Sequence, residues 1–263
     1  MNIRRFVSLI GLVGLSCLVL QSGAQSALAA PPPAAKPPAA TPPAAKPPAA
    51  TPPAATPPAA KAPATTPNPA LTAGEIADRV QIFYDKSKTF RAKFEQRYFV
   101  AAYRKTKNSN GTVVFEKPGK MSWRYETNGN RVVSDGKLIK VYDKETKQMY
   151  EQNIEKSAYP GALSFLLGGG SLKKEFNLER LDEKALGYEG GYVLKGVPKA
   201  ATPAYQTILL YVDGATHQVR RVLMIDAQQN RNRFDFVEPT VNQPVDKKEF
   251  EFVAPPGTQV VKP

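Results

Sequence analysis

The sequence predicts a mainly β fold of the α+β class, built on a strongly curved, half-open antiparallel sheet that forms an incomplete barrel. Two observations carry this prediction: residues 71–263 hold a long series of strand and hairpin signals, and helical patterns occur in only two places. Two short helices cannot cover a flat sheet of that width, so the sheet should curl around its own apolar face. The expected result is a hydrophobic cavity with the helices as its lid.

Residues 1–29 have the pattern of a secretory signal peptide. Arg4 and Arg5 precede an apolar run, and the small residues of "ALA" place the cleavage site after Ala29. The folded part is therefore expected outside the cytoplasm. Lipidation at Cys17 is the less favoured alternative, because Gly14 stands where lipoprotein signals usually carry a larger aliphatic residue. After cleavage no cysteine remains, which excludes disulfides, thiol catalysis and cysteine-ligated metals.

Residues 30–70 form a low-complexity spacer of repeated "PPAAK" and "PPAAT" units. Proline at this density prevents helix and sheet, and an extended polyproline-type segment of this length spans roughly 120 Å at about 3.1 Å per residue. An inert stalk is favoured over a ligand for a proline-binding domain. We expect the spacer to extend the domain through the cell wall, or to hold it near a partner.

Residues 71–263 have the right size for one domain with a sizeable core. The signal and the spacer contain five basic residues and no acidic ones, so the domain keeps 31 of the 36 basic residues against 23 acidic residues, a net charge of +8. For an exported protein this charge favours an anionic lipid or another acidic surface over nucleic acid as a partner.

One helix opens the domain. Thr72 followed by Glu75 makes a capping box. Apolar residues then recur at helical spacing, at Ile76, Val80, Phe83 and Tyr84.

The strands begin after this helix, where the apolar period changes to two. The first strand, "FRAKFEQRYF", places Phe90, Ala92, Phe94, Gln96 and Tyr98 on one face. The "KMSWRYE" strand that follows Lys117-Pro118 places Met121, Trp123 and Tyr125 on one face, and Ser122, Arg124 and Glu126 on the other.

Turn signals separate the other predicted strands. The signals "NSNG", "NGN" and "DG" precede "TVVFE", "RVVS" and "KLIKVYD", and a hairpin turns at Asp213 and Gly214. "RNRFDFVE" and "KEFEFV" are the late strands. The second helix should lie in "SAYPGALSFLLGGGSL" and end at Gly168 to Gly170.

In order and spacing, these features resemble the LolA family of periplasmic lipoprotein carriers over residues 72–262. The resemblance rests on the opening helix, Phe90, Phe94-x-Gln96, Gly111 before "TVVFEKP", the Trp123 strand, "VSDG" at 133–136 with Val141-Tyr142-Asp143, the Pro160 helix, the Asp226 turn and the closing "FEFVAPPGTQV". It implies a chaperone-like carrier whose cavity holds the acyl chains of lipoproteins. It also implies three partners: triacylated lipoproteins, an inner-membrane lipoprotein-releasing ABC transporter complex that loads the carrier, and an outer-membrane acceptor, LolB-like or of unknown identity, that unloads it.

The resemblance also assigns the site residues. Family members place an arginine before the proline that leads to the tryptophan strand, where it latches the lid; Lys117 stands there and lacks the planar fork of arginine. We expect a looser latch, in which Lys117 reaches carbonyl groups in residues 160–168. The expected cavity residues are Met121, Trp123, Phe94, Val80, Phe83, Leu163, Phe165, Leu166 and Leu167. Packing of Met121 and Trp123 against the first helix alone is the simpler alternative.

Catalytic and cofactor signals are missing. The domain's single histidine, His217, follows a predicted turn, and no spacing suggests zinc, calcium or a phosphate loop. We therefore expect a protein that binds no metal or cofactor and is not an enzyme. We also expect a monomer that does not bind nucleic acid. Two other functions compete with a carrier: a periplasmic lipid-sensing regulator of the same fold, and a LolB-like acceptor that requires a lipidated Cys17.

Overall fold

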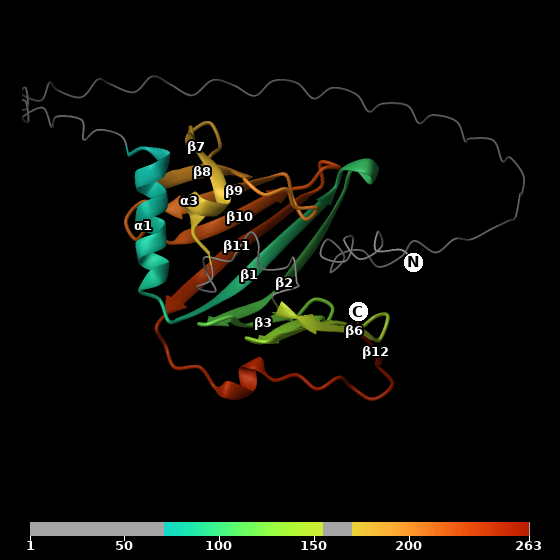
Figure 1. Ribbon diagram of the computed structural model, residues 1–263. Helices are drawn as coiled ribbons and strands as arrows, with labels where there is room; N and C mark the ends of the chain where they lie inside the picture. The colour runs from blue at the N-terminus through green and yellow to red at the C-terminus, as the bar shows by residue number, and fades with distance from the viewer. Residues whose placement is uncertain (1–70, 155–169, 263) are drawn as a thin grey trace, which may run out of the picture. The chain divides into compact units, whose positions relative to one another are not determined.

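A twelve-stranded sheet dominates the computed structural model, which describes residues 71–154 and 170–262 (Figure 1). The strands are β1 (Thr89–Val100), β2 (Lys105–Glu116), β3 (Lys120–Tyr125), β4 (Arg131–Asp135), β5 (Leu138–Asp143), β6 (Gln148–Asn153), β7 (Phe176–Leu181), β8 (Gly191–Pro198), β9 (Thr207–Asp213), β10 (Val219–Ile225), β11 (Arg231–Val241) and β12 (Gln259–Val261). Within the described residues the helical elements are α1 (Ala73–Asp85), α3 (Leu172–Glu175) and the 3-10 turns η4 (Ala101–Tyr103) and η7 (Lys247–Phe250).

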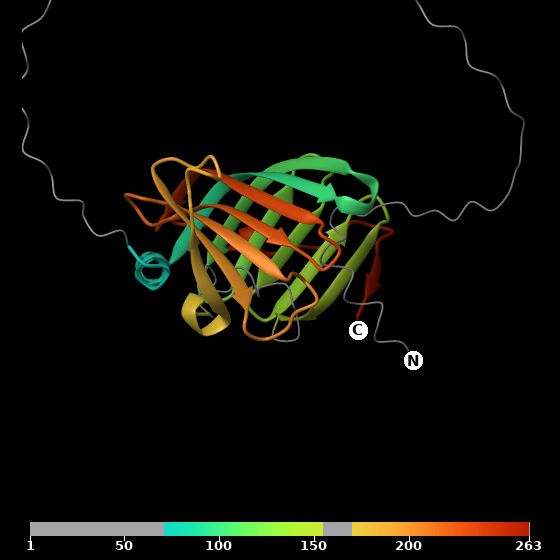
Figure 2. The same cartoon turned by 90° about the horizontal axis from the view of Figure 1, so that it is seen from above.

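Two meanders share this sheet. Strands β1 to β6 pair in sequence order, as do β7 to β11, and β1 joins the two meanders by pairing with β11. All pairs are antiparallel except β12 with β6, which is parallel. The sheet is curved and runs from β12 to β7 without closing in the part of the chain that the structure describes (Figure 2). The predicted open, curved antiparallel sheet is therefore confirmed.

The opening helix α1 begins as its sequence requires. Thr72 accepts a hydrogen bond from the Glu75 amide, and the Glu75 carboxylate accepts one from the Thr72 amide at 2.8 Å. This capping box satisfies amides that the first turn would otherwise leave without partners. The apolar stripe faces the sheet, where Ile76, Val80 and Tyr84 are buried.

The inner face of the sheet follows the predicted alternation in β1. Phe90, Ala92, Phe94 and Gln96 are buried, and the residues between them are exposed. Period-two alternation places these side chains on one face, where Phe90, Ala92 and Phe94 meet α1 and other strands in the main hydrophobic core.

The outer face of β3 and β4 is covered by the segment that follows β11, shown in red along that side of the sheet in Figure 1. "KEFEFV" was expected as a strand, and this is wrong: it begins as η7, which Asp246 caps by accepting from the Lys248 amide. Phe250 of this segment is buried against the sheet, although the segment is a 3-10 turn there and not a strand. This covering segment also explains why Ser122 is fully buried on the face that was expected to be polar.

The "NSNG" signal does not make a turn. These residues belong to β2, and the turn before them is η4, so β1 and β2 form one long hairpin. Gly111 serves close packing instead: a β-carbon there would lie 1.8 Å from the Arg124 carbonyl oxygen and 2.9 Å from the Phe94 ring. The "NGN" and "DG" turns and the hairpin at Asp213 are where the sequence predicts them.

The predicted second helix lies almost wholly outside the described residues. None of the helices in the two described ranges is long and apolar enough to cross a membrane.

Candidate functional site

Five of the predicted cavity residues meet on the inner face of the sheet. Val80, Phe94, Met121 and Trp123 belong to the main hydrophobic core, and half-buried Phe83 packs against it. The remaining four, Leu163, Phe165, Leu166 and Leu167, lie outside the described residues. Helix α1 and strands β1 and β3 thus bring together residues that are 43 positions apart in the chain, from Val80 to Trp123.

An aromatic cluster forms the centre of this inner face. The Trp123 ring lies edge-on to Phe94 at 5.0 Å, to Phe234 at 5.2 Å and to Phe115 at 5.9 Å between ring centroids. Tyr125 continues the row and contacts Phe94 at 5.0 Å. Edge-to-face pairs at these separations stabilise the cluster beyond the area they bury.

Strand β11 supplies rings that were not among the predicted site residues. Phe234 and Phe236 come from "RNRFDFVE" and pack against Trp123 and Phe90, because β11 pairs with β1. Their alternation with charged residues was visible in the sequence, but nothing local indicated that β11 would lie beside β1.

Lys117 contacts the end of α1. Its ammonium donates a hydrogen bond of 2.5 Å to the carbonyl of Tyr84, and burial lowers the pKa of Lys117. The predicted acceptors, the carbonyl groups of residues 160–168, all lie outside the described residues. Lysine donating to a terminal carbonyl of a helix is a favourable arrangement, because these carbonyls have no partner within the helix.

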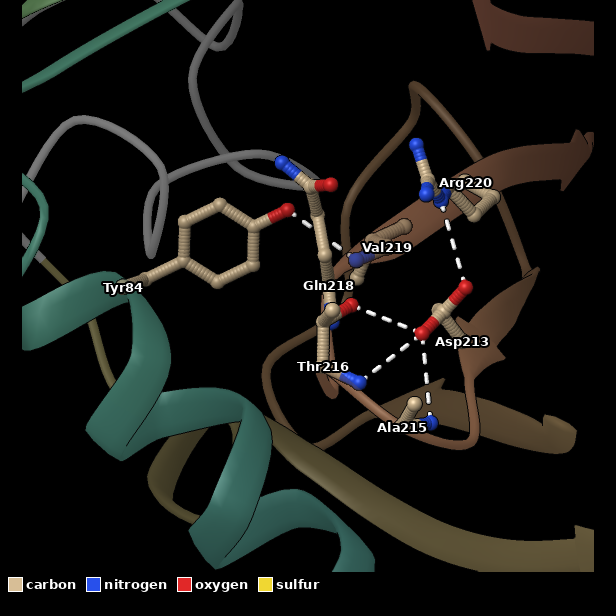
Figure 3. Close-up of polar contacts among 7 residues, drawn as sticks. All are labelled: Tyr84, Asp213, Ala215, Thr216, Gln218, Val219 and Arg220. Atoms are coloured by element: carbon tan, nitrogen blue, oxygen red, sulfur yellow. Dashed lines mark hydrogen bonds and ion pairs between the residues drawn. The ribbon is translucent and has the colours of Figure 1, made fainter. Parts of the chain in front are cut away.

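Tyr84 also reaches the opposite half of the sheet. Its hydroxyl accepts a hydrogen bond from the buried Val219 amide at 3.1 Å, at the start of β10 (Figure 3). A β-bulge between Val219 and Arg221 interrupts the β9–β10 ladder there. Through its carbonyl and its hydroxyl, Tyr84 therefore connects α1 with Lys117, between β2 and β3, and with β10.

The β9–β10 turn beside Tyr84 is held by Asp213. Its carboxylate accepts from the amides of Ala215 and Thr216 and from the Thr216 hydroxyl, and it pairs with Arg220 at 3.5 Å (Figure 3). The Thr216 amide is the main reason that the pKa of Asp213 is lowered. A preformed turn of this kind fixes the position of the Val219 amide.

His217 directly follows this turn, as the sequence predicts, with a positive φ of 61° and its ring stacked on Tyr192. Partial burial lowers the pKa of His217. Among the residues of the two described ranges, no group of three or more histidine, cysteine or acidic side chains could hold a metal ion. What the inner face offers to a ligand is apolar and aromatic surface.

The family model and the relatives found by sequence agree on one family. The model of the family described as "Outer membrane lipoprotein carrier protein LolA" matches residues 85–253. A protein named outer-membrane lipoprotein carrier protein from Nitrosomonas europaea is 25% identical over 184 residues, covering 70% of this chain and 87% of that protein. A protein of the same name from Bordetella avium is 28% identical over 199 residues, covering 74% and 91%.

Solved structures with a similar fold include an uncharacterized conserved protein from Thermus thermophilus, with a TM-score of 0.45, 15% identity and coverage of 73% of this chain and 99% of that chain. A LolA superfamily protein from Nitrosomonas europaea has a TM-score of 0.40 and 13% identity, and the match covers 70% of this chain and 99% of that chain.

Proposed function

The chain belongs to the LolA family of outer membrane lipoprotein carrier proteins, and from that premise we propose how it carries its cargo: acyl chains bind against the aromatic inner face of the curved sheet, beneath α1. The observation that supports this mechanism is the continuous apolar face that α1, β1, β3 and β11 build together. A carrier of this kind binds and releases lipoproteins and catalyses no reaction.

Burial of the acyl chains supplies the driving force. Each methylene removed from water contributes about 0.8 kcal/mol, so a free lipoprotein would aggregate or return to a membrane. In this structure the inner face is packed with the protein's own rings. Loading must therefore displace some of this packing, and the lost contacts offset part of the gain from burying the chains. This offset keeps binding reversible.

Lys117 is the proposed latch of the empty state. Its hydrogen bond to the Tyr84 carbonyl holds the end of α1 against the turn between β2 and β3. A single ammonium supports fewer acceptors in fixed geometry than a guanidinium, so the latch should open more readily than one made by arginine.

Substitution of Lys117 tests the latch. In Lys117→Leu, amides in the last turn of α1 should exchange hydrogen faster, because that end of the helix loses its hydrogen bond to Lys117. The efficiency with which bound lipoprotein is handed over should also change. Lys117→Arg should slow the exchange. Unchanged exchange and unchanged lipoprotein retention and hand-over in Lys117→Leu would show that Lys117 is only a turn residue.

The route of the cargo is inferred from the family and from the leader. We assign the protein to the periplasm, with loading by an inner-membrane lipoprotein-releasing transporter and unloading by an outer-membrane acceptor. The intact mass of the exported protein tests the leader: a chain starting at Ala30 without added acyl mass supports a free carrier, whereas acyl mass on Cys17 supports a fixed acceptor.

Lipoprotein release tests the carrier mechanism directly. The purified chain from Ala30 onward is added to spheroplasts that synthesise a radiolabelled outer-membrane lipoprotein, and the cells are pelleted. We expect labelled, acylated lipoprotein in the supernatant, bound to the added protein. Absence of release, with the protein shown to be folded, would favour the lipid-sensing regulator.

Two neighbouring positions on α1 provide a matched pair of variants. Phe83 packs against the core, whereas Ile82 is 51% exposed. Phe83→Glu should abolish release, because it places a charge against the apolar inner face. Ile82→Glu introduces the same charge one residue away and should leave release intact. Equal release by both variants would show that the inner face does not hold the cargo.

A further inference from the structure

The indole nitrogen of Trp123 is a buried hydrogen-bond donor without an acceptor. Trp123 is 1% exposed, and its Nε1 has no hydrogen-bond partner within the part of the chain that the structure describes. It is also the only tryptophan of the chain. Buried donors are almost always satisfied in folded proteins, so an orphan donor at a binding face suggests a partner that arrives with the ligand.

Aromatic rings crowd the indole of Trp123. Phe94, Phe115, Phe234 and Phe236 surround the indole, with centroids between 5.0 and 6.5 Å away. Any contact between an N–H group and an aromatic ring gains much less than a hydrogen bond to a carbonyl oxygen. Phenylalanine, although smaller, would supply an apolar ring here without an unmet donor, so tryptophan brings a polar group that apolar packing does not use.

The apolar surroundings define the kind of acceptor. An ionised carboxylate or phosphate would bring an unpaired charge among these rings, which is strongly unfavourable. A neutral carbonyl oxygen satisfies the donor without adding charge. Acyl chains carry such an oxygen at their head, in the ester or amide that joins them to the rest of the lipid.

We propose that Trp123 Nε1 donates a hydrogen bond to an ester or amide carbonyl of a bound acyl group. This assignment rests on the proposed binding of acyl chains at the inner face. The unmet donor raises the free energy of the empty state, and the loaded state relieves it, so the indole favours loading selectively. It also distinguishes acyl groups from plain hydrocarbon.

Paired ligands separate these contributions. Methyl decanoate and undecane are compared by displacement of a hydrophobic dye from the chain that starts at Ala30, in the wild type and in Trp123→Phe. We expect Trp123→Phe to weaken the ester about fivefold, as for one lost hydrogen bond, and to leave the alkane nearly unchanged. Equal weakening of both ligands would overturn the proposal and leave Trp123 as packing surface. Failure of both ligands to bind the wild type would instead count against acyl binding at this face, and with it the proposal.

Leu209→Met is the control. Leu209 is buried with Val193 and Tyr211 in a separate hydrophobic cluster outside the inner face, and methionine conserves its volume and apolar character. This variant should leave the affinities for both ligands within about twofold of the wild type.

Resonance Raman spectra of the wild type test the hydrogen bond without any substitution. Because the chain has a single tryptophan, the indole N–H marker band reports Trp123 alone. The band should indicate a free N–H in the empty protein and with undecane, and a hydrogen-bonded N–H with methyl decanoate. A hydrogen-bonded N–H in the empty protein, or no change with the ester, would overturn the proposal.

Discussion

The hydroxyl of Tyr84 satisfies a backbone amide that the sheet cannot. Val219 lies at the bulge where β10 leaves its ladder with β9, and its buried amide donates to Tyr84. Tyr84→Phe keeps the ring but removes this acceptor, so the variant should lose about 1–3 kcal/mol of unfolding free energy. Urea denaturation measures the loss.

Tyr98→Phe is the control for this prediction. The Tyr98 hydroxyl makes no hydrogen bond with any residue in the two described ranges, and the side chain is half-buried. Its removal should change the unfolding free energy by less than about 0.5 kcal/mol. A Tyr84→Phe variant as stable as Tyr98→Phe would show that water or a rearranged backbone satisfies the Val219 amide.

Buried tyrosines should limit stability at alkaline pH. Burial raises the pKa of Tyr84 and Tyr125 well above its ordinary value, and raises the pKa of Tyr205 to about 12. The folded protein keeps these protons at pH values where the unfolded chain, with tyrosine pKa values of about 10, has lost them. This contribution to stability is complete below about pH 10 and is lost as the pH rises further.

Tyrosinate absorbance measured together with unfolding checks this prediction. The last tyrosines to ionise should do so in the same transition in which the fold is lost. Full ionisation of all tyrosines near pH 10, with the fold retained, would contradict it.

At the residue scale, local patterns predicted much of the inner face. Alternation was enough to place Phe94 on it, and the spacing of "KMSWRY" placed Trp123. The partner of Lys117 was not predictable in the same way, because the Tyr84 carbonyl belongs to a helix 33 residues earlier. Long-range polar contacts of this kind depend on the tertiary arrangement and leave no local signal.

At the element scale, the segment after β11 alternates apolar and charged residues, yet the strand predicted from that alternation is wrong. Phe250 and Phe252 alternate with charged residues as a strand would. In the fold, Glu249 instead accepts hydrogen bonds from Ser122 and Arg124 at 2.9 Å each, and the Phe252 carbonyl accepts one from Lys140. Hydrogen bonds from side chains on the outer face thus hold the segment, in place of the backbone hydrogen bonds that a strand would make.

Removal of the main apolar anchor should destabilise this element. Phe250 is 4% exposed and lies against β3, with the Lys120 ammonium 5.6 Å from its ring centroid. Phe250→Ala should cost about 3 kcal/mol of unfolding free energy, as for other buried phenylalanines. Val253, in the same segment, is 87% exposed, and Val253→Ala should have no measurable effect. If Phe250→Ala were as stable as Val253→Ala, the segment would contribute no burial to the fold.

At the scale of the whole molecule, the excess positive charge is partly concentrated at the tip of the β1–β2 hairpin. Arg97, Arg104 and Lys105 are exposed there, Arg231 lies beside them on β11, and none of the four forms an ion pair with a described residue. Tyr103 at the tip is 63% exposed. Clustered cations without acidic partners attract anionic surfaces, and salt screens the attraction over about 10 Å at 0.1 M.

Vesicle co-sedimentation tests this expectation. Vesicles containing phosphatidylglycerol should bind the protein at low ionic strength and release it as salt is added, and Arg104→Glu with Lys105→Glu should reduce the bound fraction severalfold. Lys137→Glu with Lys184→Glu makes the same change in net charge at exposed positions in other loops. Equal reduction by both double variants would show that net charge, and not the hairpin, governs the attraction.

The seam between β1 and β11 also constrains how the domain folds. Each meander pairs neighbours that follow one another in the chain, and such hairpins form quickly. The pair that joins them brings Phe90 beside Val241, so it must wait until almost the whole domain is available. A chain that is still being made holds two partial sheets at most, each with an unpaired edge where the other belongs. Completion of this one pair should therefore be the slow, late step of folding. Until then the chain stays open enough to be translocated across a membrane or bound by chaperones.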